Sequence, residues 1–148
     1  MTHYKHILAA IDESPISYAA AEHARDIAKV FGSKVTLISV IAVDPFSGVD
    51  FYKVAPAVTD YFLKAEQNAL DRLNDLKQSF DREGVSLDIR ILHGMSPSDG
   101  IVQTSQELPI DLIVMGSHGR KGLQKLFIGS VAQNVLGSSE IPILIVKE

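Results

Sequence analysis

The sequence predicts an α/β protein whose open parallel sheet carries helices on both faces. Five short runs of mainly apolar and β-branched residues alternate with four stretches in which apolar residues recur every three or four positions. Alternating strands and helices are typical of βαβ units, whose right-handed crossovers make the strands parallel. With 148 residues, the chain is expected to form one domain, 1–148, with a substantial core.

The strands are expected at five runs. These are 6–11, 34–41, 86–92, 111–116 and 142–147. The first, fourth and fifth are nearly continuous apolar runs, as expected of strands covered on both faces. The second and third alternate in part, which predicts that they lie nearer an edge of the sheet.

The first two helices are predicted from long apolar stripes, which we interpret as core faces. Ser14 suits the N-cap of the first helix, Pro15 its first position and Gly32 its end. Its stripe is Ile16, Ala20, Ala24, Ile27 and Phe31. The stripe of the second helix is Val58, Phe62, Ala65, Ala69, Leu73, Leu76 and Phe80, and Gly84 ends it.

The last two helices are predicted from their end signals. The third begins at Ser96-Pro97, with Asp99 placed for a capping box, and stops before Pro109. The fourth begins near Ser130 and stops before Gly137.

Segment 42–56 is long for a connection between a strand and a helix, and it contains Phe46, Phe51 and Tyr52. It fits a surface excursion that folds its aromatic rings onto the domain. It also fits a lid or a loop that contacts a partner, and the composition leaves both interpretations open.

The composition excludes several classes of function. A formal net charge of −4 argues against general affinity for nucleic acid or anionic membranes. The absence of cysteine excludes disulfides, zinc–thiolate sites and a thiol nucleophile. No run approaches the ~20 apolar residues of a membrane span, and the first residues do not resemble a signal peptide. We therefore expect a cytoplasmic protein with no membrane insertion.

The segment after the fourth strand has glycine at 116, 119 and 129, with Ser130 next. If the first and fourth strands are neighbours, Asp12 and Gly116 face each other across the crevice where α/β sheets bind ligands. Gly116 and Gly119 would let the backbone approach a ligand. The helix that begins at Ser130 would seat phosphate, with Arg120, Lys121 and Lys125 offsetting its charge.

An ordinary turn followed by an ordinary helix cap explains the same glycines, so their spacing alone leaves phosphate binding open. Neither the dinucleotide fingerprint nor the Walker loop is present.

The spacing G-x2-G-x9-G-[ST], formed here by Gly116, Gly119, Gly129 and Ser130, resembles the motif of the universal stress proteins. The resemblance extends over essentially the whole chain, through "ILAAIDES", "HGMSPSDGIV" and "IPILIVKE". It implies a Rossmann-like fold of the adenine nucleotide α-hydrolase type with strand order 3-2-1-4-5. It also implies membership of the branch that binds ATP, with or without Mg²⁺.

The resemblance assigns roles to particular residues. Ala10 and Val40 are expected to flank adenine, Asp12 to lie near the ribose and phosphates, and Met115 and Gly116 to line the ribose side. Gly119, Gly129, Ser130 and Val131 are expected to hold the phosphates through backbone N–H groups and the Ser130 hydroxyl. Ser117, His118 and Arg120 occupy variable positions of the motif, so their roles are open.

The resemblance also suggests a homodimer that pairs two C-terminal edge strands, 142–147, because an exposed apolar edge invites pairing. A monomer whose edge is shielded by Lys147 and Glu148 is the alternative.

Three functions remain from the sequence. The first is a regulatory, stress-response module that binds ATP and is not an enzyme, with hydrolysis at most slow. The second is an ATPase, favoured by the cationic residues 120–125. The third is a protective or interaction protein with a vestigial pocket.

Overall fold

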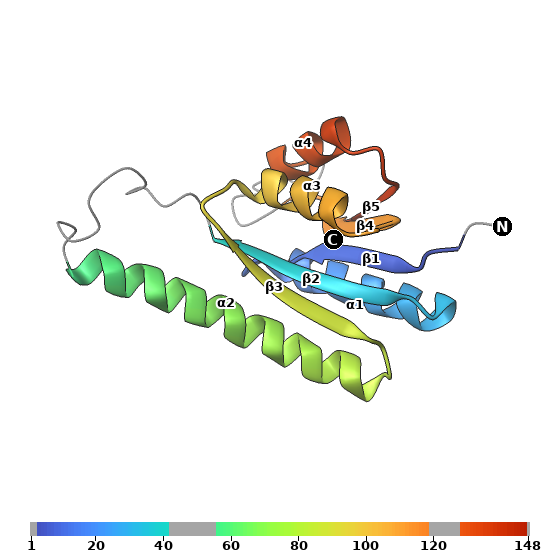
Figure 1. Cartoon of the computed structure of the whole chain (residues 1–148), viewed down its shortest axis with the longest axis horizontal. Helices are drawn as coiled ribbons and strands as arrows, with labels where there is room; N and C mark the ends of the chain where they lie inside the picture. The colour runs from blue at the N-terminus through green and yellow to red at the C-terminus, as the bar shows by residue number, and fades with distance from the viewer. Residues whose placement is uncertain (1–2, 42–55, 119–127, 148) are drawn as a thin grey trace.

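The computed structural model describes residues 3–41, 56–118 and 128–147, with side chains from residue 60 onward in the second range. Five parallel strands form one sheet in the order β3-β2-β1-β4-β5 (Figure 1). They are β1 (His6–Ala10), β2 (Lys34–Ile41), β3 (Leu87–His93), β4 (Leu112–Gly116) and β5 (Ile143–Val146). Every expected strand is present with each end within one residue of its prediction, and the expected order is confirmed.

Four helices cover the two faces of the sheet. They are α1 (Pro15–Phe31), α2 (Pro56–Arg82), α3 (Pro97–Glu107) and α4 (Ser130–Ser138). One core lies under α1 and α2 and includes Ile7 and Ala9, whereas the other lies under α3 and α4 and includes Leu8 (Figure 1). Successive strand residues therefore serve opposite cores, as the period of two in a strand requires.

The start of α1 differs from the prediction in one respect. Pro15 occupies the first helical position and Gly32 closes the helix with a φ of 68°, as expected. Ser14 precedes the helix, but its side chain makes no capping bond. Its hydroxyl instead donates to the Asp12 carboxylate. A hydrogen bond to a charged acceptor is stronger than one from a neutral amide, so the hydroxyl turns toward Asp12 and away from the helix N–H groups.

The ends of α3 and α4 test the other capping signals. The Ser96 hydroxyl accepts a 3.2 Å hydrogen bond from the N–H of Asp99, which is one half of the expected capping box. The prediction that α4 stops before Gly137 is wrong, because the helix continues to Ser138. A glycine inside a helix costs only about 1 kcal/mol, and helix packing readily outweighs that amount.

The sheet edges are formed by β3 and β5. The partly alternating pattern of the third run agrees with its edge position, and β2 lies next to it. The continuous apolar pattern of the fifth run predicts cover on both faces, and this prediction is wrong, because within this chain β5 is not covered on both faces. Leu144 is 37% exposed there, whereas Val146 is buried. The two segments 42–55 and 119–127 lie outside the described residues.

Candidate functional site

A cavity of about 620 Å³ opens at the carboxyl ends of β1, β2 and β4. β1 pairs with β2 on one side and with β4 on the other. The crossover from β1 runs through α1, on one face, and the crossover into β4 runs through α3, on the other. This reversal is the position at which open α/β sheets bind ligands.

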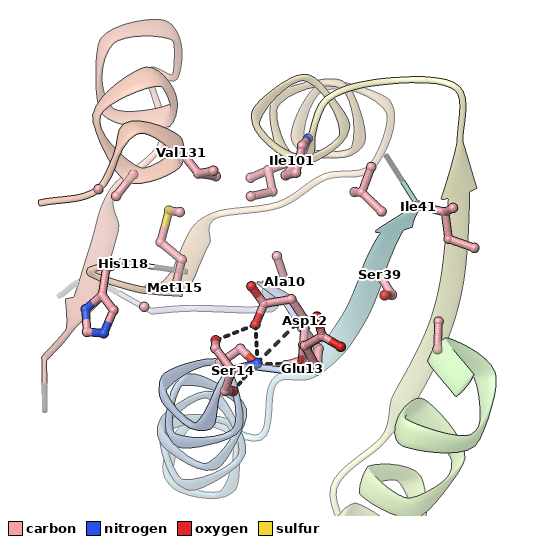
Figure 2. Close-up of a pocket in the computed structure, with 18 of the residues that line it drawn as sticks. Ala10, Asp12, Glu13, Ser14, Ser39, Ile41, Ile101, Met115, His118 and Val131 are labelled. Atoms are coloured by element: carbon pink, nitrogen blue, oxygen red, sulfur yellow. Dashed lines mark hydrogen bonds between the residues drawn. The ribbon is translucent and has the colours of Figure 1, made fainter. Parts of the chain in front are cut away.

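Most of the expected site residues come together around this cavity, several of them visible in Figure 2. Nine line it: Ala10, Asp12, Val40, Met115, Gly116, His118, Gly129, Ser130 and Val131. Ser117 does not line the cavity and is buried, at 3% exposure. Gly119 and Arg120 lie outside the described residues.

Asp12 is fixed at the cavity wall by the first turn of α1. Its Oδ1 accepts hydrogen bonds from the Ser14 N–H, at 2.7 Å, and from the Ser14 hydroxyl (Figure 2). Its backbone N–H and carbonyl both bond to the Ser17 hydroxyl, at 3.2 and 2.9 Å. Oδ2 accepts no hydrogen bond from any group in the described part of the chain. One carboxylate oxygen is therefore held by the protein and the other remains for a ligand.

The backbone N–H of Gly129 does not point into the cavity. It donates a 2.6 Å hydrogen bond to the Ser117 carbonyl, while the Ser117 N–H donates to the Val146 carbonyl at 2.8 Å. A protein carbonyl therefore takes, in this structure, the amide that was expected to hold phosphate. This bond ties the turn after β4 to the start of α4.

The first turn of α4 contains N–H groups that have no acceptor within the helix. The first hydrogen bond of this helix runs from the Gln133 N–H to the Gly129 carbonyl, at 3.0 Å. The N–H groups of Ser130, Val131 and Ala132 precede it, so the helix itself does not use them. All three residues line the cavity. The partial positive charge of the helix N-terminus therefore faces this space.

At two glycines of the motif, neighbouring protein atoms leave little room for a side chain. A Cβ on Gly116 would lie 2.9 Å from Cγ2 of Ile16, on α1. A Cβ on Gly129 would lie 3.1 Å from Cα of His118. The neighbour that a Cβ on Gly116 would meet is thus α1, and the approach of the Gly116 backbone to a ligand stays a prediction. Its missing side chain lets β4 and α1 pack closely.

One end of the cavity is an apolar wall on the face covered by α3 and α4. Ala10, Val40, Met115 and Val131 form it together with Ile101, which the sequence analysis missed. Gly100 lets α3 approach this wall, because a Cβ there would meet Val40 Cγ2 at 2.6 Å. Such a wall suits the flat apolar face of a heterocyclic base.

The sequence analysis also missed the lining residues on the other face of the sheet. Ser39 and Ile41 contribute from β2, and Ala65, Ala69 and Arg72 contribute from α2. A signal for Arg72 existed: it follows Ala65 and Ala69 at helical spacing, so it interrupts an apolar stripe with a charge.

A metal centre and a membrane span are two other kinds of site to consider for the described residues. No group of three or more His, Asp or Glu side chains placed to hold a metal occurs among them. The described helices include none long and apolar enough to cross a bilayer. His118 lines the cavity, and its Nδ1 lies 3.2 Å from the Ser117 hydroxyl.

The fold and this cavity define a Rossmann-like α/β protein with a cavity at the strand-order reversal. The chain belongs to the universal stress protein family, whose family model matches residues 3–147. Universal stress protein MJ0531 of Methanocaldococcus jannaschii is 34% identical over 145 residues, which cover 98% of this chain and 83% of that protein.

Solved structures agree with this assignment. The structure of MJ0577, also from M. jannaschii, superposes with a TM-score of 0.85 at 27% identity, covering 99% of this chain and 98% of the other. A universal stress protein from Archaeoglobus fulgidus was solved in complex with dAMP; it has a TM-score of 0.68 at 21% identity and coverage of 99% and 100%. A further universal stress protein was solved in complex with cAMP. It has a TM-score of 0.68 at 22% identity, covering 99% of this chain and 98% of the other. The last two, under 25% identical, show the shared fold alone.

Proposed function

We propose that this protein binds ATP in the cavity and works as a nucleotide-dependent regulatory module of the stress response, not as an enzyme. The observation that carries the proposal is the cavity itself. It joins an apolar wall, the carboxylate of Asp12 and the open N-terminus of α4 in one continuous space.

The chemistry of these three parts matches the three parts of a nucleotide. The base packs against Ala10, Val40 and Met115 on the apolar wall. The ribose lies beside Asp12, whose free oxygen accepts from its hydroxyl groups. The phosphates lie at the first turn of α4, where the amides and the hydroxyl of Ser130 are donors and the helix dipole favours negative charge.

Relatives support the adenine part of the proposal. Two universal stress proteins of the same fold were solved with adenine nucleotides, cAMP in one and dAMP in the other. Magnesium also fits the site, because a free carboxylate oxygen of Asp12 and phosphate oxygens are the hard ligands it prefers. When bound, the ion would neutralise phosphate charge.

The proposal of binding without rapid turnover rests on the same geometry. Fast phosphoryl transfer requires an oriented base or water and charges aimed at the transition state. His118 is the imidazole that lines the described cavity, and its bonding partner is the Ser117 hydroxyl. Hydrolysis on this site would be slow and would act as a timer.

We also propose a homodimer formed through β5. This strand is at the sheet edge, with Leu144 37% exposed, and on α4 Leu136 is 44% exposed. Antiparallel pairing of two β5 strands about a two-fold axis would satisfy the edge amides and cover this apolar surface.

The test of nucleotide binding needs no prior choice of ligand. The protein is purified under native conditions, denatured, and the released small molecules are identified by mass. Calorimetric titration with ATP, ADP and AMP follows, with and without magnesium. We expect an adenine nucleotide in the extract and saturable binding in the titration. An empty extract together with no heat of binding would refute the proposal.

A further inference from the structure

Arg72 of α2 is a cation that no described group neutralises. It lines the cavity and is half-buried, and its Nε is inaccessible to solvent and has no hydrogen-bond partner. The guanidinium forms none of the ion pairs found within the described residues. The residue as a whole is partly exposed and lines the cavity, so its charge is available to a ligand there.

Arg72 is also the only lysine or arginine among the cavity-lining residues that the structure describes. It marks one end of the cavity, which we call the α2 lobe, formed by Ser39, Ile41, Ala65, Ala69 and Arg72. The two alanines are small and leave room beneath the arginine. Ser39 and Ile41 lie at the end of the cavity away from His118 and Val131 (Figure 2).

The α2 lobe lies on the opposite face of the sheet from the apolar wall. Neighbouring residues of β2 point to opposite faces, so Val40 contributes to the wall and Ser39 and Ile41 to the lobe. The cavity therefore bends around the carboxyl edge of the sheet. Asp12 lies where the two parts meet.

An acidic side chain near Arg72 could supply the acceptor in place of a ligand. The ion pairs found within the described residues join Arg72 to neither Asp12 nor Asp75, which lies three residues further along α2. Burial raises the pKa of the Tyr18 phenol, and the charge of Arg72 opposes that rise. The positive field of Arg72 therefore reaches the first turn of α1, at the junction of the two parts.

We propose that the α2 lobe is a second anion subsite, in which Arg72 binds a phosphoryl group carried on the 2′ or 3′ oxygen of the nucleotide's ribose. This inference rests on the proposed function. With the base on the apolar wall and the 5′ phosphates at α4, the remaining side of the ribose faces the lobe. The planar fork of a guanidinium matches two phosphoryl oxygens.

The experiment compares three ligands by calorimetry: adenosine 5′-phosphate, adenosine 2′,5′-bisphosphate and adenosine 3′,5′-bisphosphate. We expect one bisphosphate to bind the wild-type protein about tenfold more tightly than the monophosphate, as a charge-assisted hydrogen bond would give. Arg72→Gln should remove this preference and leave the affinity for the monophosphate within about twofold. Arg72→Lys should keep part of it, because the charge remains and the fork is lost.

Arg82→Gln is the matched control. Arg82 ends the same helix, is exposed, and lies outside the cavity. This variant should keep the full preference. Thermal melting of every variant establishes that it is folded, and the lysine variant carries the test if the glutamine variant does not fold.

The outcomes separate this inference from the proposed function. Equal affinity of the wild-type protein for mono- and bisphosphates would overturn the second subsite and leave nucleotide binding intact. A preference that survives in Arg72→Gln would also overturn it, since Arg72 would then be structural. A wild-type protein that binds none of the three ligands, nor ATP, would overturn both proposals.

Discussion

The backbone N–H of Gly129 lies 2.6 Å from the carbonyl oxygen of Ser117 and donates a hydrogen bond to it. This bond joins the two ends of the glycine motif, the turn after β4 and the start of α4. The motif therefore builds the junction that orients the first turn of α4 toward the cavity. In the function we propose, the phosphate donors are the amides that follow, at Ser130 and Val131.

Gly129→Ala should damage this junction. The added Cβ would lie 3.1 Å from His118 Cα and 3.3 Å from the Ser117 carbonyl, and both neighbours are backbone atoms. We expect a loss of about 1–3 kcal/mol in the free energy of unfolding, as is typical of overpacking. Nucleotide affinity should fall at least tenfold, because α4 would no longer present its amides correctly. Chemical denaturation and calorimetry measure the two effects.

Gly137→Ala is the control for that substitution. Gly137 lies inside α4, and a Cβ there meets nothing within 4 Å. Alanine is the better helix former, so stability should rise by about 0.5–1 kcal/mol with binding unchanged. Equal nucleotide affinities in the two alanine variants would contradict our account of the junction.

Asp12→Asn should remove the dependence of binding on magnesium. The amide oxygen can still accept from the Ser14 N–H, which now lies 2.7 Å from Oδ1, so the local turn should persist. The charge that attracts a hard cation is lost. We expect magnesium to strengthen ATP binding to the wild-type protein and to leave this variant unaffected. Asp26→Asn, at an exposed position of α1, should behave as wild type.

Leu144→Glu should separate the proposed homodimer. Leu144 lies on the edge strand β5, and pairing two such strands would place like charges in the interface. Analytical ultracentrifugation should show a dimer for the wild-type protein and a monomer for the variant. Val30→Glu is the control, since Val30 is 80% exposed and lies on α1 and not on the sheet edge. A wild-type protein that sediments as a monomer at micromolar concentration would count against the dimer.

His6 should make stability depend on pH. Burial lowers the pKa of His6 below 6.5, with the charge of Lys34 as the next cause. Its Nε2 lies 2.8 Å from the Thr36 hydroxyl. Because the unfolded state binds the proton more readily, the free energy of unfolding should be constant above pH 6.5. It should fall below that pH, by at most about 1.4 kcal/mol per pH unit.

Urea denaturation of His6→Gln and of the exposed control His23→Gln at pH 7.5 and 5.5 isolates this contribution. The loss of stability between the two pH values should be smaller in His6→Gln than in the wild-type protein. It should be unchanged in His23→Gln. An identical loss in all three proteins would exclude His6 as the source.

The strands, the helices and their alternation could all be predicted from the sequence, because they depend on local patterns. The spacing of apolar residues sets the helical faces, and residues such as Pro15 and Gly32 mark helix ends through their own backbone preferences. Most of the candidate site was also predictable. Its residues follow the ends of strands, and the carboxyl ends of parallel strands gather at one edge of the sheet.

The hydrogen-bond partner of each polar atom and the direction each glycine faces could not be predicted, because they depend on contacts made in the folded structure. Ser117 takes the Gly129 amide, Ile16 fills the space beside Gly116, and Arg72 reaches the cavity from α2. Each of these relationships joins segments that are separate in the chain. Distant contacts depend on how whole helices pack, and no periodicity within one segment records that packing.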